Sequence, residues 1–393
     1  MFGIISANII FAIKMIISES AYQVLFVILV PALLFTLYLV LGNRLDITDN
    51  PGGRSSHTRS TITGAGVVYT LSLFISIWYF DLFISWPWII GLILVVGISF
   101  IDDLYFLKHS IRFVAQLIGV ALLLFSIPQL VEANWVTTLP IWIAGLLFGV
   151  CVLNGFNFMD GINGMLSLTS MVVLGSLAYL NASVEFVEPI FIYSLMGANL
   201  VFLFLNLRPR ALAFMGDAGS IGLSFSILYL VYLLIAQTNQ VVYLLLFSVI
   251  GIDSGLTVIY KLILKENIFV PHRDFLFKKL VHVGKYGHVR ISVIYAGIQA
   301  MINLFLLFIP LSTNGFYQIS LVFLFISLQG VAFIYFRNQL TKTRVIKYFA
   351  RKVQEDRAQN HKMLLETRES SSTPKPRLLR NHTNAKPRKV YYS

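Results

Sequence analysis

The sequence predicts an all-α polytopic membrane protein with about eleven transmembrane helices, on three observations. First, 57% of the 393 residues are hydrophobic and only 12% are charged, with a mean hydropathy of +0.78. Soluble proteins of this size carry about a quarter charged residues. Second, apolar stretches of spanning length recur along the chain. Third, nearly all Lys and Arg residues fall in alternate loops between these stretches.

The apolar stretches define the expected helices. A transmembrane helix needs about 20 predominantly apolar residues, and several of these stretches are somewhat shorter. The expected helices cover residues 22–42, 63–80, 84–101, 111–127, 138–153, 163–180, 189–205, 219–236, 240–262, 291–309 and 316–336. We therefore expect a transmembrane catalytic domain over 22–336, between an N-terminal extension (1–21) and a C-terminal tail (337–393).

The N-terminal extension is apolar but does not form a clear span. Its segment "FGIISANIIFAIKMII" (2–17) contains Lys14. A short extra span, a signal-like segment and an interfacial stretch all fit this pattern. Initiation of synthesis at Met15 is a further alternative. We expect no true transmembrane span in this segment.

The distribution of positive charge predicts the orientation. Loops 81–85, 128–137, 181–188, 237–239 and 310–315 contain no Lys or Arg. The other loops, counted with the residues at their rims (43–62, 102–112, 154–162, 206–218 and 261–290), and the tail contain 29 of the 30 Lys and Arg residues, which places them in the cytoplasm. The tail alone has 15, in a polar, Pro-containing sequence that predicts disorder. Such a membrane-proximal basic tail favours membrane lipid over nucleic acid as its partner.

Paired carboxylates stand at the end of one expected helix, in "SFIDDLYFL" (99–107). Adjacent side chains on a helix point about 100° apart, so Asp102 and Asp103 can share a ligand only where the helix ends. Two carboxylates at one spot repel unless a cation or a proton joins them. A solvated helix end is the structural alternative.

Two further cytoplasmic motifs combine glycines with polar residues. The segment "NGFNFMDGINGM" (154–165) suits a tight loop with free backbone amides, or alternatively a helix-capping turn. In "FMGDAGSIGLSF" (214–225), Asp217 stands between two glycines just before an expected helix. The N–H groups at a helix start bind phosphate, and a neighbouring carboxylate can hold Mg²⁺.

The loop 263–290 is the most cationic region before the tail. It contains Arg273, Lys278 and other Lys and Arg residues together with His272 and His288. This density suits an anionic ligand such as a diphosphate, although a topology signal would look similar. Periodicity predicts a short amphipathic helix over 275–283.

One acidic residue, Asp253, falls inside an expected transmembrane helix. A charge at membrane depth requires a partner or a function.

In this order, the motifs resemble the polyprenyl-phosphate N-acetylhexosamine-1-phosphate transferase superfamily (glycosyltransferase family 4). This superfamily includes the bacterial enzymes that start O-antigen or enterobacterial common antigen. The similarity covers roughly residues 40–292. Its motifs are "LDITDNPGGRSSH" (45–57), "DD" (102–103), "NGFNFMDGING" (154–164), "FMGDAGS" (214–220) and "PHRDFLF…GHVRIS" (271–292).

The resemblance implies a fold with a cytoplasmic-face cleft that binds a UDP-sugar, Mg²⁺ (or Mn²⁺) and undecaprenyl phosphate. Asp102 and Asp103 match the paired acids that engage the lipid phosphate and the cation. Asp217 matches a Mg²⁺ ligand. Asp160 matches a loop implicated in nucleotide-sugar binding and catalysis. The predicted catalytic residues are thus Asp102, Asp103 and Asp160.

The resemblance also implies a set of substrate-binding residues. Asn154 and Asn157 match the loop implicated in nucleotide-sugar binding. The three basic-loop residues, His272, Arg273 and His288, match the loop that holds the donor phosphates. Asp253 matches an acidic position common in the ninth helix. The predicted set is Asn154, Asn157, Asp253, His272, Arg273 and His288.

The implied activity transfers N-acetylhexosamine-1-phosphate from a UDP-sugar to undecaprenyl phosphate, releases UMP and starts a lipid-linked cell-surface glycan. The "PHR…GHVR" pattern favours a deoxygenated N-acetylhexosamine as the donor sugar. The implied location is the bacterial inner membrane, with the active site and C-terminus cytoplasmic, and a homo-oligomer is compatible with the sequence.

A transporter of anionic solutes and a membrane scaffold are the alternative functions. Transport sites, however, usually lie near the bilayer midplane within repeated helices.

Overall fold

The computed structural model describes residues 2–49, 60–105, 107–266, 274–308 and 314–342, with side chains from residue 21 onward. Apart from one short two-stranded sheet, every regular element in these ranges is helical. The prediction of an all-α polytopic membrane protein is therefore confirmed. The predicted disordered tail lies almost entirely outside the described residues.

Nine helices in the described residues are long and apolar enough to cross a membrane. They are Ala21–Arg44 within α1 (Phe2–Arg44), α3 (Trp86–Tyr105), α6 (Trp135–Met159), α7 (Met165–Val184), α8 (Pro189–Asn206), α9 (Gly216–Thr238), η1 with α10 (Val241–Phe247 and Ser248–Ile263), α12 (His288–Phe308) and the last helix, Gly315–Lys342. Two shorter apolar helices, α2 (Val67–Tyr79) and α4 (His109–Phe125), complete the set. Each predicted stretch overlaps one of these helices.

The N-terminal segment continues directly into the first span. Helix α1 runs from Phe2 to Arg44, and the part that qualifies as a span begins at Ala21. The prediction that residues 2–17 do not form a span of their own stays a prediction.

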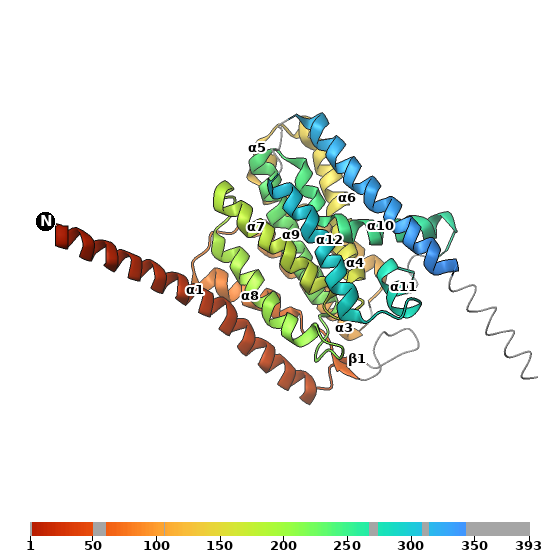
Figure 1. Cartoon of the computed structure of the whole chain (residues 1–393), viewed down its shortest axis with the longest axis horizontal. Helices are drawn as coiled ribbons and strands as arrows, with labels where there is room; N and C mark the ends of the chain where they lie inside the picture. Colours follow the sequence, from red (N-terminus) through yellow and green to blue (C-terminus); the bar gives the residue numbers. More distant parts are fainter. Residues whose placement is uncertain (1, 50–59, 106, 267–273, 309–313, 343–393) are drawn as a thin grey trace, which may run out of the picture. The chain divides into compact units, whose positions relative to one another are not determined.

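Helix α9 is the central element of the structure (Figure 1). In its most apolar stretch of 18 residues, 89% of the residues are buried, and α9 contacts α2, α3, α6 and α7. Small residues on α9 allow neighbouring helices to approach closely, as is usual in membranes. At Gly222, for example, a Cβ atom would lie 2.9 Å from both the Thr70 hydroxyl and a Val96 methyl group. The position of α9 therefore controls how the helices around it pack.

A short stretch of extended backbone fixes the start of α9. Strands β1 (Thr48–Asp49) and β2 (Thr61–Ile62) pair antiparallel, and Ile62 also forms a parallel bridge to Ala213. The Gly66 amide then donates to the Met215 carbonyl at 2.8 Å. This pairing joins the segment before α2 to the segment before α9.

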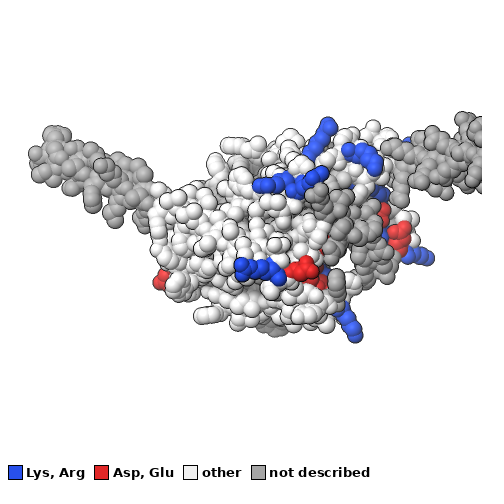
Figure 2. Space-filling model, turned by 90° about the horizontal axis from the view of Figure 1, so that it is seen from below, with Lys and Arg blue, Asp and Glu red and all other residues white. Residues whose placement is uncertain are grey.

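Several helices begin or end at the same end of the bundle. Helices α3 and α6 end, and α4, α9 and α12 begin, at the end that carries β1 (lower in Figure 1), whereas α5 (Pro128–Glu132) lies at the other end. Figure 2 views the molecule from below, where Lys, Arg, Asp and Glu side chains lie on an otherwise uncharged surface.

The close packing of α2 against α9 predicts intolerance to one added methyl group. A Cβ on Gly219 would overlap the Gly66 Cα and the Met215 side chain. Overpacking of this kind costs about 1–3 kcal/mol, so we expect Gly219→Ala to lower the thermal unfolding midpoint in detergent. Gly175→Ala is the matched control, because no atom lies within 4 Å of its Cβ position. Equal midpoints for the two variants would contradict this packing.

Candidate active site

The paired acids at the end of α3 have different partners. Asp102 accepts the Leu107 amide on Oδ1 at 2.6 Å, and its Oδ2 lies 2.6 Å from Arg112 Nη1. Asp103 instead accepts the amides of Asp217, at 2.9 Å, and Ala218, at 3.1 Å. The offset of adjacent side chains on a helix explains why the two carboxylates serve different neighbours.

Asp103 holds the first turn of α9. The N–H groups of a helix start lack partners within the helix and attract negative charge. Gly216 adopts a positive φ of 74°, and a Cβ there would lie 2.8 Å from Asp103 Oδ2. Two of the amides that the sequence suggested for phosphate binding therefore bind a carboxylate of the protein.

Arg112 joins two acids from different helices. Its Nη1 and Nη2 atoms lie 2.6 Å from Asp102 Oδ2 and 2.6 Å from Asp217 Oδ2, respectively. The guanidinium group suits this task because it is planar and presents a fixed fork of donors. In the sequence, Arg112 is one of two Lys or Arg residues in the segment 102–112 and resembles a topology signal. Its place in the first turn of the helix after the paired acids was the available signal.

The end of α6 reaches the same acids. Asn157 donates to the Ser220 hydroxyl at 3.1 Å, and Ser220 donates to the Asp217 carbonyl at 3.2 Å. Asp160 caps α6 and is half-buried. Burial raises the pKa of the Asp160 carboxyl well above its ordinary value, and the charges of Asp217 and Asp103 raise it further. Asp160 therefore holds a proton more readily than an exposed carboxyl.

The acids Asp102, Asp103, Asp160 and Asp217 form an acid cluster. One lysine of the predicted basic loop reaches this cluster. Lys278 lies on α11 (Leu276–His282), which confirms the predicted short amphipathic helix, and its charge lowers the pKa of Asp160. Gly161 allows the approach, because a Cβ there would overlap Lys278 Cε and lie 3.0 Å from its Nζ. Among the cations of the loop that the structure describes, Lys278 is thus the one that acts on Asp160.

Two predicted residues lie beside the cluster and stabilise its surroundings. Asn154 donates to Gln116 Oε1 at 2.6 Å and to the Val150 carbonyl at 2.8 Å, so it links α6 to α4. His288 Nδ1 accepts the Asn163 amide at 3.4 Å and thereby contacts the loop that follows Asp160.

The remaining predictions lie elsewhere. Asp253 is buried in α10 and accepts hydrogen bonds from α11 and α12, away from the paired acids. His272 and Arg273 lie outside the described residues, as do residues 50–57 of the first motif. The predicted cytoplasmic cleft stays a prediction.

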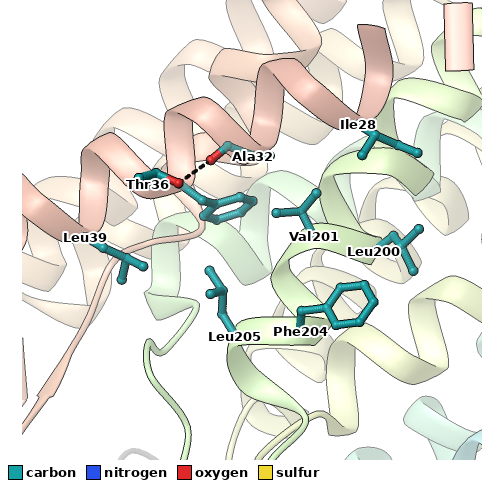
Figure 3. Close-up of a pocket in the computed structure, with 9 residues that line it drawn as sticks. Ile28, Ala32, Thr36, Leu39, Leu200, Val201, Phe204 and Leu205 are labelled. Carbon is teal, nitrogen blue, oxygen red and sulfur yellow. Dashed lines mark hydrogen bonds between the residues drawn. The ribbon is translucent and has the colours of Figure 1, made fainter. Parts of the chain in front are cut away.

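An apolar cavity of about 290 Å³ between α1 and α8 is not this site (Figure 3). Its polar side chain, Thr36, donates to the Ala32 carbonyl at 2.7 Å, so the cavity offers hydrocarbon contacts but no charged group. Its walls come from Ile28, Ala32, Phe35, Thr36, Leu39, Leu200, Val201, Phe204 and Leu205. A reaction on an anionic substrate requires charged groups, which the acid cluster and Arg112 supply.

The donor set of the cluster fits Mg²⁺. In the part of the chain that the structure describes, no three Asp, Glu, His or Cys side chains form a ready metal cage. Mg²⁺, however, usually binds to one or two carboxylates together with substrate phosphates. The Oδ2 atoms of Asp102 and Asp217 already converge on one positive charge, the Arg112 guanidinium.

The fold and the cluster define a multi-pass membrane protein with acidic and basic side chains gathered where its helices end. Residues 85–235 match the family model described as Glycosyl transferase family 4. This match confirms the predicted resemblance to that family. It includes all four clustered acids and Arg112, and it ends before Lys278.

Two curated relatives point the same way. The chain is 27% identical, over 52% of its length and 61% of the relative, to "Probable undecaprenyl-phosphate N-acetylglucosaminyl 1-phosphate transferase" of Bacillus subtilis (strain 168). It is 31% identical to "Phospho-N-acetylmuramoyl-pentapeptide-transferase" of Parabacteroides distasonis, over 44% of this chain and 42% of that relative. The chain therefore spans less than two thirds of either relative.

The bridge between Asp102 and Asp217 predicts a cation-dependent stability. Arg112→Gln removes the charge between these acids, and the two carboxylates then repel each other. We expect a lower thermal unfolding midpoint, which MgCl₂ restores more than KCl of equal ionic strength does. Arg112→Lys should fall between, because an ammonium group cannot present two parallel donors. Equal Mg²⁺ responses in all three proteins would contradict this account.

Proposed function

We propose that the protein transfers N-acetylhexosamine-1-phosphate from a UDP-sugar to undecaprenyl phosphate, with release of UMP. The grouping of four acids carries this proposal: Arg112 joins Asp102 to Asp217, Asp103 binds the Asp217 amide, and the charges of Asp103 and Asp217 act on Asp160. The names of both relatives describe transfers of the same general kind. We place the reaction at the cytoplasmic face of a bacterial inner membrane, as the start of a lipid-linked cell-surface glycan. A deoxygenated N-acetylhexosamine is the donor that we favour.

The reaction joins two anions, so its main obstacle is electrostatic repulsion. A phosphate oxygen of the lipid attacks the β-phosphorus of the UDP-sugar, and UMP leaves. Positive groups positioned around the reacting phosphates supply most of the catalysis in such transfers. Within the described ranges, the charges of Arg112 and Lys278 act on these acids. We assign Lys278 to the donor phosphates, together with His272, Arg273 and His288 from the sequence.

The four acids divide into three roles in this proposal. Asp217, assisted by Asp102, would hold Mg²⁺, which when bound neutralises charge on the diphosphate. Asp103 keeps both oxygens on the amides of α9, so it positions Asp217. Asp160, with its raised pKa, is suited to accept the proton of the lipid phosphate. Asn157 orients the first turn of α9 through Ser220.

The position of the cluster also suits a lipid acceptor. The polyprenyl chain stays in the bilayer because its transfer to water is unfavourable, whereas the phosphate must reach water-soluble UDP-sugar. The ends of membrane helices are the place where both conditions hold. A transporter would require an available charge deep in a span, but the Asp253 carboxylate is already bound to three protein groups.

The direct test measures UMP release by purified protein given Mg²⁺, undecaprenyl phosphate and a panel of UDP-N-acetylhexosamines. We expect Asp217→Asn to reduce turnover by about 10²–10³-fold, because a charge-stabilising group at the reacting phosphates is lost. Glu132→Gln, an exposed position on α5 at the other end of the bundle, should leave turnover unchanged. Absence of UMP release with every donor would overturn the proposed function. Near-normal turnover of a folded Asp217→Asn protein would exclude Asp217 from the site.

A second prediction concerns pH. Lys278 lowers the pKa of Asp160, so Lys278→Gln should raise it. If ionised Asp160 accepts the proton, the acidic limb of kcat/KM against pH should move to higher pH in this variant. Lys285→Gln, an exposed position in the same loop, serves as the control. An unmoved limb, or one displaced to lower pH, would exclude this pairing.

A further inference from the structure

Asp253 is a buried acid that the proposed reaction does not use. It lies inside the candidate span Val241–Ile263, and only 2% of its surface is exposed. An ionisable group at such a position is expensive unless it is paired or has a function. Its contacts show which groups it serves.

The Asp253 carboxylate connects three helices. Its Oδ1 accepts the Leu276 amide at 2.9 Å, and its Oδ2 accepts the Phe277 amide at 3.2 Å. The Tyr295 hydroxyl of α12 donates to the same Oδ2 at 2.6 Å. The two amides open α11, where backbone N–H groups have no partner within the helix. Asp253 on α10 therefore holds the start of α11 against α12.

The start of α11 in turn determines where Lys278 lies. Phe275 and Phe277 are buried, with ring centroids 5.7 Å apart, so this end of α11 is fixed in register. Lys278 follows directly, and its Nζ lies 5.2 Å from the Phe275 ring centroid. The same side chain packs on Gly161, next to Asp160. A displacement of the Phe277 amide would therefore displace Lys278 from the acids.

We propose that Asp253 is a positioning residue, which places Lys278 beside Asp160 by holding the first two amides of α11. This role follows from the contacts of the Asp253 carboxylate, since both of its oxygens accept hydrogen bonds from the protein and the residue is only 2% exposed. The consequence for catalysis rests on the proposed function, in which Lys278 binds the donor phosphates. The anchoring itself does not.

Hydrogen exchange tests the anchor without reference to activity. Asp253→Asn replaces one acceptor oxygen with an NH₂ group, so amides 276 and 277 should exchange about tenfold faster in the purified full-length protein. Glu266→Gln is the control, because Glu266 is an acid that pairs with Lys261 of α10 rather than with α11. Unchanged protection of these amides in Asp253→Asn would overturn the proposal.

A double-mutant cycle tests the link to Lys278. Loss of one charged hydrogen bond predicts an increase of about tenfold in the KM for the UDP-sugar in Asp253→Asn, with a smaller change in kcat. If Asp253 acts through Lys278, adding Asp253→Asn to Lys278→Gln should raise KM no further. Multiplied effects would overturn the proposal.

Tyr295→Phe offers a milder second variant, since it keeps both backbone contacts of Asp253. Its KM for the UDP-sugar should rise less than that of Asp253→Asn. A larger rise would contradict the proposal that Asp253 acts mainly through the two α11 amides. Failure of the unchanged protein to release UMP would refute the proposed function, and hydrogen exchange would then decide the anchoring proposal alone.

Discussion

The two hydrogen bonds from the start of α9 to Asp103 are the contacts on which the site depends. They fix the first turn of the central helix against the end of α3. Asp217, in that same turn, then meets Arg112, and Arg112 meets Asp102. Because α9 also contacts α2, α6 and α7, its placement connects the arrangement of the charges to the packing of the bundle.

The sequence predicted the helices and the grouping of acids well, since both follow from local signals. Apolar length defines a span, and alternation of basic loops assigns the polar motifs to one side. The role of Arg112 was missed because a lone basic residue in a loop resembles a topology signal. Lys278 was noted only within a cationic loop, since charge density does not reveal which side chain points inward.

Asp253 shows a different limit of sequence reasoning. The sequence indicated correctly that an acid inside a span needs partners, but two of its three partners are backbone amides 23 and 24 residues away. Backbone groups carry no sequence signature, so only the fold reveals such a contact. The resemblance to glycosyltransferase family 4 had suggested substrate binding for this position. The position of a residue in a family motif therefore does not reveal which groups its side chain binds in the fold.

The large sequence separation within the site has a consequence for biosynthesis. The Asp217 amide that binds Asp103 is 114 residues further along the chain. During synthesis, helix α3 therefore enters the membrane with Asp103 still lacking this partner, whereas the partners of Asp102 follow within ten residues. Water or lipid head groups must solvate the Asp103 carboxylate until α9 has been made. Assembly of the charged cluster is thus a late event in membrane insertion, and a ribosome that stalls before α9 leaves an acidic helix end without its partner helix.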